Sequence, residues 1–101
     1  MTTIEIRKTT RFLRWLDSLR DVQARAKVLS RLKRMSMGNF GDVRPAGAGV
    51  SELRIDYGPG YRVYFTQHGD VVVLLAGGKK ATQSRDIEQA IRMAKDFKVI
   101  P

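Results

Sequence analysis

The stretch ELRIDYGPGYRVYF, residues 52–65, decides the fold of this chain of 101 residues. Apolar and polar residues alternate on both sides of its Gly-Pro-Gly segment, and this alternation predicts two antiparallel strands joined by a tight turn. One register places every apolar side chain on the same face of the hairpin. In this register the opposing pairs are Tyr57 with Tyr61, Ile55 with Val63, and Leu53 with Phe65.

The opposite face of this hairpin carries polar and charged side chains, namely Glu52, Arg54, Asp56, Arg62 and Tyr64. Guanidinium groups on adjacent strands can bind a phosphate bidentately, so this face is a candidate binding site for an anion. Alternatively, the carboxylates pair with the arginines across the hairpin, each exposed pair contributing about 0–1 kcal/mol. Tyr64 either stacks on a nucleic-acid base or merely covers the sheet.

A short strand and two helices are predicted before the hairpin. Residues 3–8 alternate as a strand does, and Thr9 or Thr10 can cap a helix that runs through residue 20. Asp21 is a second cap, and Gly38 ends the second helix. The expected buried stripes are Phe12, Leu13, Leu16 and Leu19 in the first helix and Val22, Ala26, Leu29 and Leu32 in the second.

A loop, a strand and a last helix complete the chain. Residues 38–50, GNFGDVRPAGAGV, are rich in glycine and contain proline, which predicts a loop. Residues 67–70 form a second tight turn, and VVVLLA at 71–76 is apolar throughout, which predicts a central strand covered on both faces. Thr82 or Ser84 can cap the last helix. Its expected stripe is Ile87, Ala90, Ile91 and Ala94.

These elements predict an α+β domain that spans residues 1–101. Its order is β-α-α-β-β-β-α, with a small, mostly antiparallel sheet of four strands. The N-terminal helical hairpin is expected to cover one face of that sheet.

The chain is strongly basic, with a net charge of +9 and a pI of about 10.5. Ten of the 19 lysines and arginines precede residue 38, against three acidic residues. Such an excess favours a polyanionic partner, nucleic acid or an acidic protein, over a plain solubility charge. The lack of cysteine excludes disulfides and thiolate catalysis, and the single histidine excludes a His/Cys zinc site. The sequence shows no signal peptide or spanning segment, which favours a cytoplasmic location.

Enzymatic options are narrow. His68 lies in a tight turn without the partners of a catalytic triad, and no phosphate-binding glycine loop is present. What remains is a cluster of four cations, expected to converge from three neighbouring strands: Arg54, Arg62, Lys79 and Lys80. Such a cluster can hold RNA and stabilise the charge that grows on a phosphorus during its transfer. We expect neither a metal nor another cofactor.

Three phrases resemble a known family: ELRIDYGPGYRVYF, LLAGGKKATQSRDIEQA and RFLRWLDSLRD. With the chain's size, charge and strand order, they resemble the RelE/ParE superfamily of bacterial toxins. More narrowly, they resemble its phage-derived addiction module killer protein branch, akin to HigB toxins. The resemblance covers about residues 3–98. It implies a RelE-like fold and a toxin of a type II toxin–antitoxin system, one that enters the ribosomal A site and cuts mRNA there.

The resemblance also implies roles for particular residues. The 2′-hydroxyl of the RNA would attack the adjacent phosphate, with Arg62 neutralising that phosphate and Arg54 orienting the backbone. Lys79 or Lys80 would stabilise the transition state or protonate the 5′-oxygen. Asp86 is either the general base or a helix N-terminal residue favoured by the dipole. The residues expected to bind RNA are Arg44, Tyr64 and Arg85.

Two further functions stay open. A ParE-like toxin, which inhibits DNA gyrase by binding, shares the fold without the cationic cluster. An inactive relative would bind only its antitoxin or operator DNA. The expected partner is a helix-turn-helix antitoxin encoded nearby, whose acidic residues would speed association and whose complex would bind operator DNA. We expect no membrane partner.

Overall fold

The computed structural model describes residues 3–96 of the chain. The strands form one sheet in the order β1-β5-β4-β3-β2, with β1 parallel to β5 and the other pairs antiparallel. The predicted α+β class and mostly antiparallel sheet are therefore confirmed. The elements are β1 (Glu5–Lys8), α1 (Thr10–Ser18), α2 (Val22–Ser36), β2 (Val43–Gly47), β3 (Val50–Ile55), β4 (Tyr61–His68), β5 (Val71–Lys79), a 3-10 turn (Lys80–Thr82) and α3 (Gln83–Asp96).

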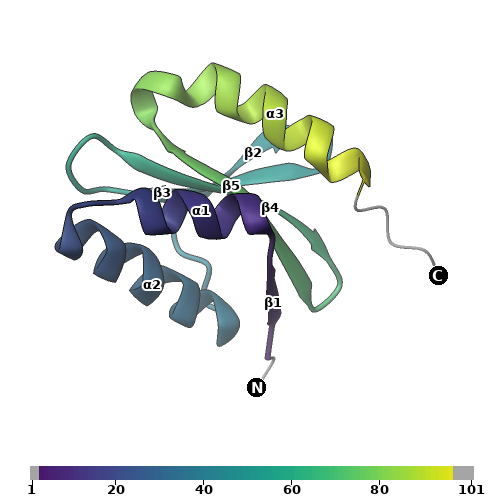
Figure 1. Cartoon of the computed structure of the whole chain (residues 1–101). Helices are drawn as coiled ribbons and strands as arrows, with labels where there is room; N and C mark the ends of the chain where they lie inside the picture. The colour runs from purple at the N-terminus through teal and green to yellow at the C-terminus, as the bar shows by residue number, and fades with distance from the viewer. Residues whose placement is uncertain (1–2, 97–101) are drawn as a thin grey trace.

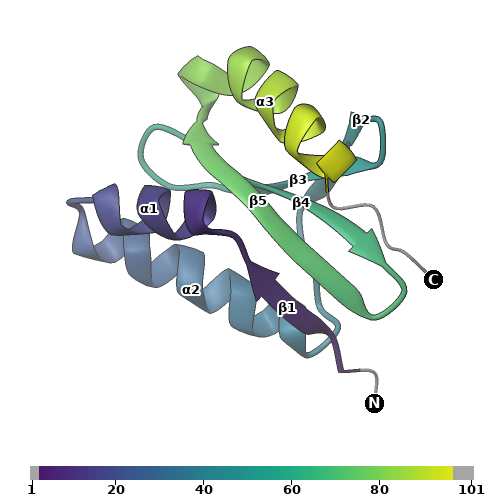
Figure 2. The ribbon, with the colours of Figure 1, turned by 45° about the vertical axis from the view of Figure 1, so that its right-hand side comes forward.

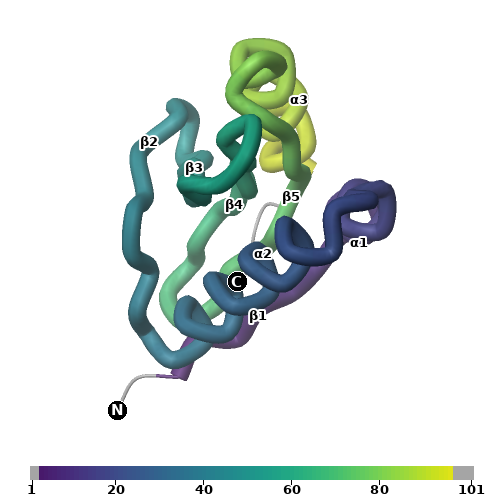
Figure 3. Tube along the Cα trace, turned by 90° about the vertical axis from the view of Figure 1, so that its left-hand side faces the viewer, coloured from purple at the N-terminus to yellow at the C-terminus, as the bar shows by residue number. Residues whose placement is uncertain are grey.

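The sheet separates two helical layers (Figure 1). The hairpin of α1 and α2 covers one face, and α3 lies across the opposite face (Figures 2 and 3). Both helices of the hairpin begin where the sequence predicts. The Thr9 hydroxyl accepts a hydrogen bond from the Phe12 N–H, and the Asp21 carboxylate accepts from the N–H groups of Gln23 and Ala24.

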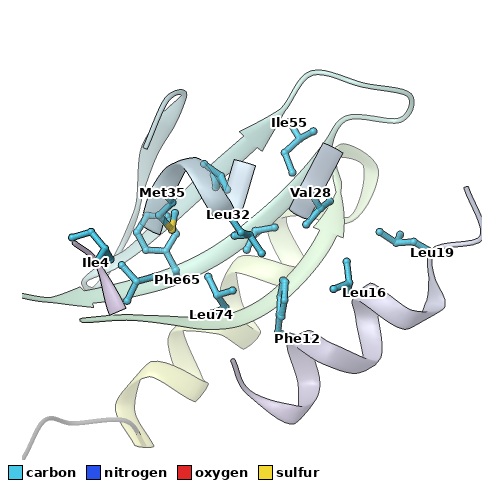
Figure 4. Packing of buried hydrophobic residues seen from close by; sticks show 13 residues of the cluster. Ile4, Phe12, Leu16, Leu19, Val28, Leu32, Met35, Ile55, Phe65 and Leu74 are labelled. Carbon is cyan, nitrogen blue, oxygen red and sulfur yellow. The ribbon is translucent and has the colours of Figure 1, made fainter. Parts of the chain in front are cut away.

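The larger core lies between the helical hairpin and the sheet (Figure 4). Phe12, Val28 and Leu74 are completely buried there, and each such side chain contributes about 1.5–3 kcal/mol of burial free energy. The other members of this core are Ile4, Leu16, Leu19, Leu32, Met35, Leu53, Ile55, Val63, Phe65 and Val72.

The predicted stripe of the second helix is correct at Leu32 and wrong at its other three positions. Val22 and Leu29 are 76% and 43% exposed, whereas Ala24, Val28, Leu32 and Met35 are buried. Apolar residues in α2 satisfy two stripes with helical spacing, and packing against the sheet selects the one that ends at Met35. In α1, Leu13 is exposed as well, because the buried face consists of Phe12 and Leu16.

The expected loop at residues 38–50 contains a fifth strand, which corrects the predicted count of four. Strand β2 pairs with β3 at the free edge of the sheet, with Pro45 opposite Ser51. Proline is tolerated at such an edge because it has no N–H to donate to a neighbouring strand. Gly47, Ala48 and Gly49 then turn the chain with positive φ angles.

The register of the decisive hairpin differs from the predicted one by two residues. Leu53 is opposite Val63, Ile55 is opposite Tyr61, and the turn is correspondingly longer. Because side chains alternate with a period of two, this shift leaves every residue on its predicted face. Gly58 and Gly60 adopt positive φ angles of 54° and 78° in the turn, a conformation that glycine adopts readily.

Strand β5 is interior to the sheet along residues 71–74 and covered on both faces, as predicted. Its register with β4 shifts between Tyr64 and Phe65, which leaves Leu75 as an extra residue in β5. Leu75 and Ala76 therefore both belong to the smaller core beneath α3. This core also holds Val50, Tyr64, Val73 and Ala90, with Ile87, Ile91 and Ala94 packed against it.

Candidate functional site

A concavity of about 500 Å³, the hairpin concavity, opens beside the turn between β3 and β4. Three of the four predicted cations, Arg54, Arg62 and Lys80, line it. In the sheet Arg54 is directly opposite Arg62, an arrangement of like charges that is unfavourable without nearby anions. The other lining residues are Asp42, Ile55, Asp56, Gly58, Pro59 and Gly60.

The turn holds Lys80 in place through its backbone. The Lys80 N–H donates a hydrogen bond of 2.9 Å to the Gly60 carbonyl. A Cβ atom at position 60 would lie 3.3 Å from the Cβ of Lys80 and 3.5 Å from Nη1 of Arg62. The close packing of Gly60 thus brings Lys80 beside Arg62. The Lys80 side chain is exposed and forms no ion pair within residues 3–96.

Arg62 is nearly buried and pairs with Glu52, so for this residue the alternative of a carboxylate pairing across the hairpin holds, and Arg62 is not a free cation. Its Nε lies 3.0 Å from Oε1 of Glu52, and the two side chains are 7% and 6% exposed. Gln83, from the start of α3, donates hydrogen bonds of 2.6 and 3.0 Å to the two oxygens of Glu52. Nη1 of Arg62 donates to the carbonyls of Gly60 and Tyr61. Arg62 is therefore a fixed, largely compensated charge in the wall of the concavity.

Arg54 is held mainly through its backbone. Arg31 of α2 donates a hydrogen bond of 2.7 Å to the Arg54 carbonyl, and the Arg54 N–H donates to the carbonyl of Asp42. Burial lowers the pKa of Arg31. The side chain of Arg54 is 35% exposed, and its Nε lies 4.0 Å from the Asp42 carboxylate, so the two charges are only loosely paired.

Lys79 does not join the other three cations in the hairpin concavity. It pairs with Tyr61 in the sheet and lines a separate concavity of about 410 Å³, the edge concavity, between α1 and the start of α3. The expected convergence of four cations is thus limited to three. Since the bulge at Leu75 reverses the facing of the residues that follow it, the alternation pattern alone does not predict the position of Lys79.

Asp86 also lies in the edge concavity rather than beside Arg62. Its Oδ2 accepts a hydrogen bond of 2.5 Å from the Thr82 hydroxyl, and its carboxylate packs over Gly78 so tightly that a Cβ there would overlap it. This position in the first turn of α3 agrees with the helix N-terminal alternative for Asp86.

The three predicted RNA-binding residues lie in different places. Tyr64 is completely buried beneath α3, so its ring is not accessible to a nucleic-acid base. The predicted stacking role is therefore wrong, and the alternative role, in which Tyr64 covers the sheet, is confirmed. Burial raises the pKa of Tyr64, and the nearby charge of Glu52 raises it further. Arg44 is exposed on β2, 3.9 Å from Asp42. Arg85 is exposed and lines the edge concavity.

Sequence reasoning missed several functional candidates. Asp56 is the exposed carboxylate that shares the hairpin concavity with Arg54 and Lys80 and forms no ion pair in the described part of the chain. Gln83 donates a hydrogen bond to the Glu52 carboxylate and so helps to position Arg62. Arg31 donates a hydrogen bond to the carbonyl of Arg54 and so helps to position that residue. Both contacts join segments far apart in sequence, so no local pattern signals them.

No helix among residues 3–96 combines the length and apolar character that crossing a bilayer requires. Over the same range, no three side chains of His, Asp or Glu gather as a metal site would need.

Comparison with known proteins shows similarity to a protein family, to a bacterial relative and to a solved structure. The profile of the Phage derived protein Gp49-like family matches residues 14–98. An uncharacterized protein from Haemophilus influenzae is 48% identical over 96 residues, which cover 94% of this chain and 97% of the relative. The E. coli toxin RelE, solved as a mutant in the free state, superposes with a TM-score of 0.72 at 14% identity, covering 90% of this chain and 97% of that one. The expected RelE-like fold is confirmed.

Proposed function

Because this chain belongs to the Phage derived protein Gp49-like family and has a RelE-like fold, we propose that it is the toxin of a type II toxin–antitoxin pair. We propose further that it is a ribosome-dependent endoribonuclease, which cuts mRNA in the ribosomal A site and so inhibits translation in the cytoplasm. The observation that carries this proposal is the hairpin concavity, where the exposed Lys80 and the partly exposed Arg54 stand beside the fixed Arg62.

The proposed chemistry needs only the RNA and side chains of this protein. The 2′-oxygen loses its proton to a general base and attacks the adjacent phosphorus, and the bond from phosphorus to the 5′-oxygen breaks. The products are a 2′,3′-cyclic phosphate and a 5′-hydroxyl. Lys80 stabilises the phosphate charge and donates the proton to the departing 5′-oxygen, while Arg54 orients the RNA backbone.

Asp56 replaces Asp86 as the proposed general base. A base must be within hydrogen-bond reach of the proton it removes. Asp56 shares the hairpin concavity with Arg54 and Lys80, whereas Asp86 lines the edge concavity and accepts the hydrogen bond from Thr82. Arg62 contributes a fixed donor in the wall of the site, held by Glu52.

The proposed partner is a helix-turn-helix antitoxin encoded nearby. A chain with a net charge of +9 would attract acidic residues on that antitoxin and associate with it quickly. The complex, more than the toxin alone, would bind operator DNA.

The test is to induce the protein in a bacterial host and map the 5′ ends of cellular mRNAs. The proposal expects codon-phased cuts that disappear with Lys80→Ala and persist with Lys33→Ala, an exposed lysine on α2. An SOS response with intact mRNA would instead identify gyrase as the target, as for a ParE-like toxin. Normal growth at high expression would identify an inactive relative.

A pair of asparagine variants separates the two candidate bases. Asp56→Asn is expected to lower the single-turnover cleavage rate by about 10²–10⁴-fold, the usual contribution of a general base. Asp86→Asn should leave the rate within a few-fold of wild type if the enzyme remains folded. The opposite pattern would return the role to Asp86.

A further inference from the structure

We propose that the protein binds single-stranded RNA along a cationic path that extends from the hairpin concavity, around the open end of β5, to helix α1. This inference rests on the proposed function for the identity of the polymer. The path adds a binding surface beyond the residues assigned to cleavage.

The path is continuous because neighbouring concavities share lining residues. Lys80 belongs both to the hairpin concavity and to a hollow of about 310 Å³ along residues 80–85. Thr82 and Arg85 belong both to that hollow and to the edge concavity. Trp15 and Gly77 join the edge concavity to a last hollow of about 560 Å³ on α1.

Beyond the hairpin concavity, the cations that line the path are free of ion pairs among the described residues. Arg11 and Arg14 line the last hollow, and Arg20, Lys79 and Arg85 line the edge concavity. Within residues 3–96, none of these five side chains forms an ion pair, and all are exposed. Asp86, the one carboxylate lining these last three hollows among the described residues, already accepts a hydrogen bond from Thr82. A row of uncompensated cations along a groove is the usual surface for a nucleic-acid backbone.

The open end of β5 gives the path its floor. Strand β1 pairs with β5 along residues 71–74 and ends there (Figure 2). Beyond Leu74, no strand among the described residues pairs with the outer edge of β5. The half-buried indole of Trp15 packs over Gly77 at this edge, against the rim of Tyr61 at 6.3 Å between ring centroids. An aromatic ring beside a cationic groove favours a single strand, whose unpaired bases can stack on it, over a duplex.

The test uses 2′-O-methyl oligouridylates, which lack the attacking hydroxyl and so report binding without cleavage. We expect affinity to rise with length from about 3 to about 12 nucleotides, and the fluorescence of Trp15, the single tryptophan, to fall on binding. The variant Arg11→Ala/Arg14→Ala should weaken binding of the long oligonucleotide only, and reduce the slope of log affinity against log salt by about 1.4. The exposed pair Lys33→Ala/Arg34→Ala on α2 is the matched control.

Several results would overturn the path. One is equal affinity for short and long oligonucleotides, and another is an α1 variant that binds RNA as tightly as wild type does. A third is equally tight binding of duplex RNA or of polyglutamate, which would indicate a general surface for polyanions. If mRNA is cut and the α1 variant still binds normally, the path fails while the proposed function stands. If mRNA stays intact while length-dependent binding is seen, the proposed cleavage fails and the path stands.

Discussion

Glu52 and Arg62 form a buried ion pair, with 3.0 Å between Oε1 and Nε and less than a tenth of either side chain exposed. The two residues are diagonal neighbours on β3 and β4, since Glu52 is opposite Tyr64 and Arg54 is opposite Arg62. Gln83 ties the carboxylate to α3, so the pair joins the wall of the hairpin concavity to the helix on the sheet's second face. Arg62 thus has a structural role in addition to any chemical one.

Removing Arg62 alone should destabilise the protein substantially. Arg62→Ala leaves the Glu52 carboxylate buried without its partner, and such a loss typically costs about 3–5 kcal/mol in the free energy of unfolding. The double variant Glu52→Gln/Arg62→Met, which removes both charges, should recover most of that loss. Denaturant unfolding followed by circular dichroism measures both effects.

Arg54→Ala is the control for this prediction. The Arg54 side chain is partly exposed and its Nε lies 4.0 Å from the Asp42 carboxylate. The free energy of unfolding of the Arg54→Ala variant should therefore fall by about 1 kcal/mol or less. An Arg62→Ala protein as stable as the Arg54→Ala protein would show that the buried pair does not support the fold.

Gly77 is required by the packing of Trp15. A Cβ atom at position 77 would overlap the indole, since it would lie 2.1 Å from Cδ2. We therefore expect Gly77→Ala to lower the free energy of unfolding by about 1–3 kcal/mol and to shift the emission of the single tryptophan. In the double variant Gly77→Ala/Trp15→Leu the two losses should be less than additive. Strict additivity would mean that the indole can move aside freely.

The pKa of Asp21 should depend on Tyr57. The hydrogen bond from the Tyr57 hydroxyl, 2.8 Å long, is the largest cause that lowers the pKa of Asp21 below its ordinary value of 3.8. The stabilisation linked to this lowered pKa is therefore present above pH 3.8 and is lost as the pH falls through the folded-state pKa. Tyr57→Phe should raise the pKa of Asp21 and reduce the extra stability near neutral pH.

Carbon-detected NMR titration of the Asp21 carboxyl group measures this shift. The phenylalanine ring preserves the contact with Lys27, whose Nζ lies 5.3 Å from the centre of the Tyr57 ring, so only the hydroxyl is tested. An unchanged titration curve would show that the N–H groups of Gln23 and Ala24 alone set the acidity of this helix cap.

The hydroxyl of Tyr64 should be dispensable for stability. It is buried and has no hydrogen-bond partner among the described residues. Tyr64→Phe removes this desolvated group without changing the shape of the ring, so the unfolding free energy should stay the same or rise by about 1 kcal/mol. RNA cleavage should also be unchanged. A large drop in stability would mean that an ordered water satisfies the hydroxyl.

The period of two in residues 52–65 was enough to predict the hairpin and its two faces, because face depends on parity and survives a register shift of two residues. The caps at Thr9 and Asp21 were predictable because they are local interactions between a side chain and the N–H groups that follow it. Strand β2 was missed because its proline and glycines indicate a loop, and only pairing with β3 makes it a strand.

Much of the candidate site depends on contacts that span the sequence. The bulge at Leu75 sets which face of the sheet Lys79 takes, and the position of α3 brings Gln83 to the carboxylate of Glu52. Tyr64 has the correct face in the prediction, but whether α3 buries that face is a tertiary question. The sequence therefore predicted which residues share a face better than which of them remain free to bind.

The parallel pairing of residues 5–8 with residues 71–74 also has a consequence for biosynthesis. Strand β5 lies between β1 and β4 in the sheet. As the chain leaves the ribosomal exit tunnel, β1 and the hairpin of α1 and α2 emerge long before β5, so β1 must wait for its partner strand. A chain whose translation stops before Val71 lacks β5 and Lys80, so it can complete neither this pairing nor the hairpin concavity. For a protein proposed to cut messenger RNA, breakage of its own transcript within the first seventy codons would thus yield fragments without a finished site, and its synthesis would limit itself.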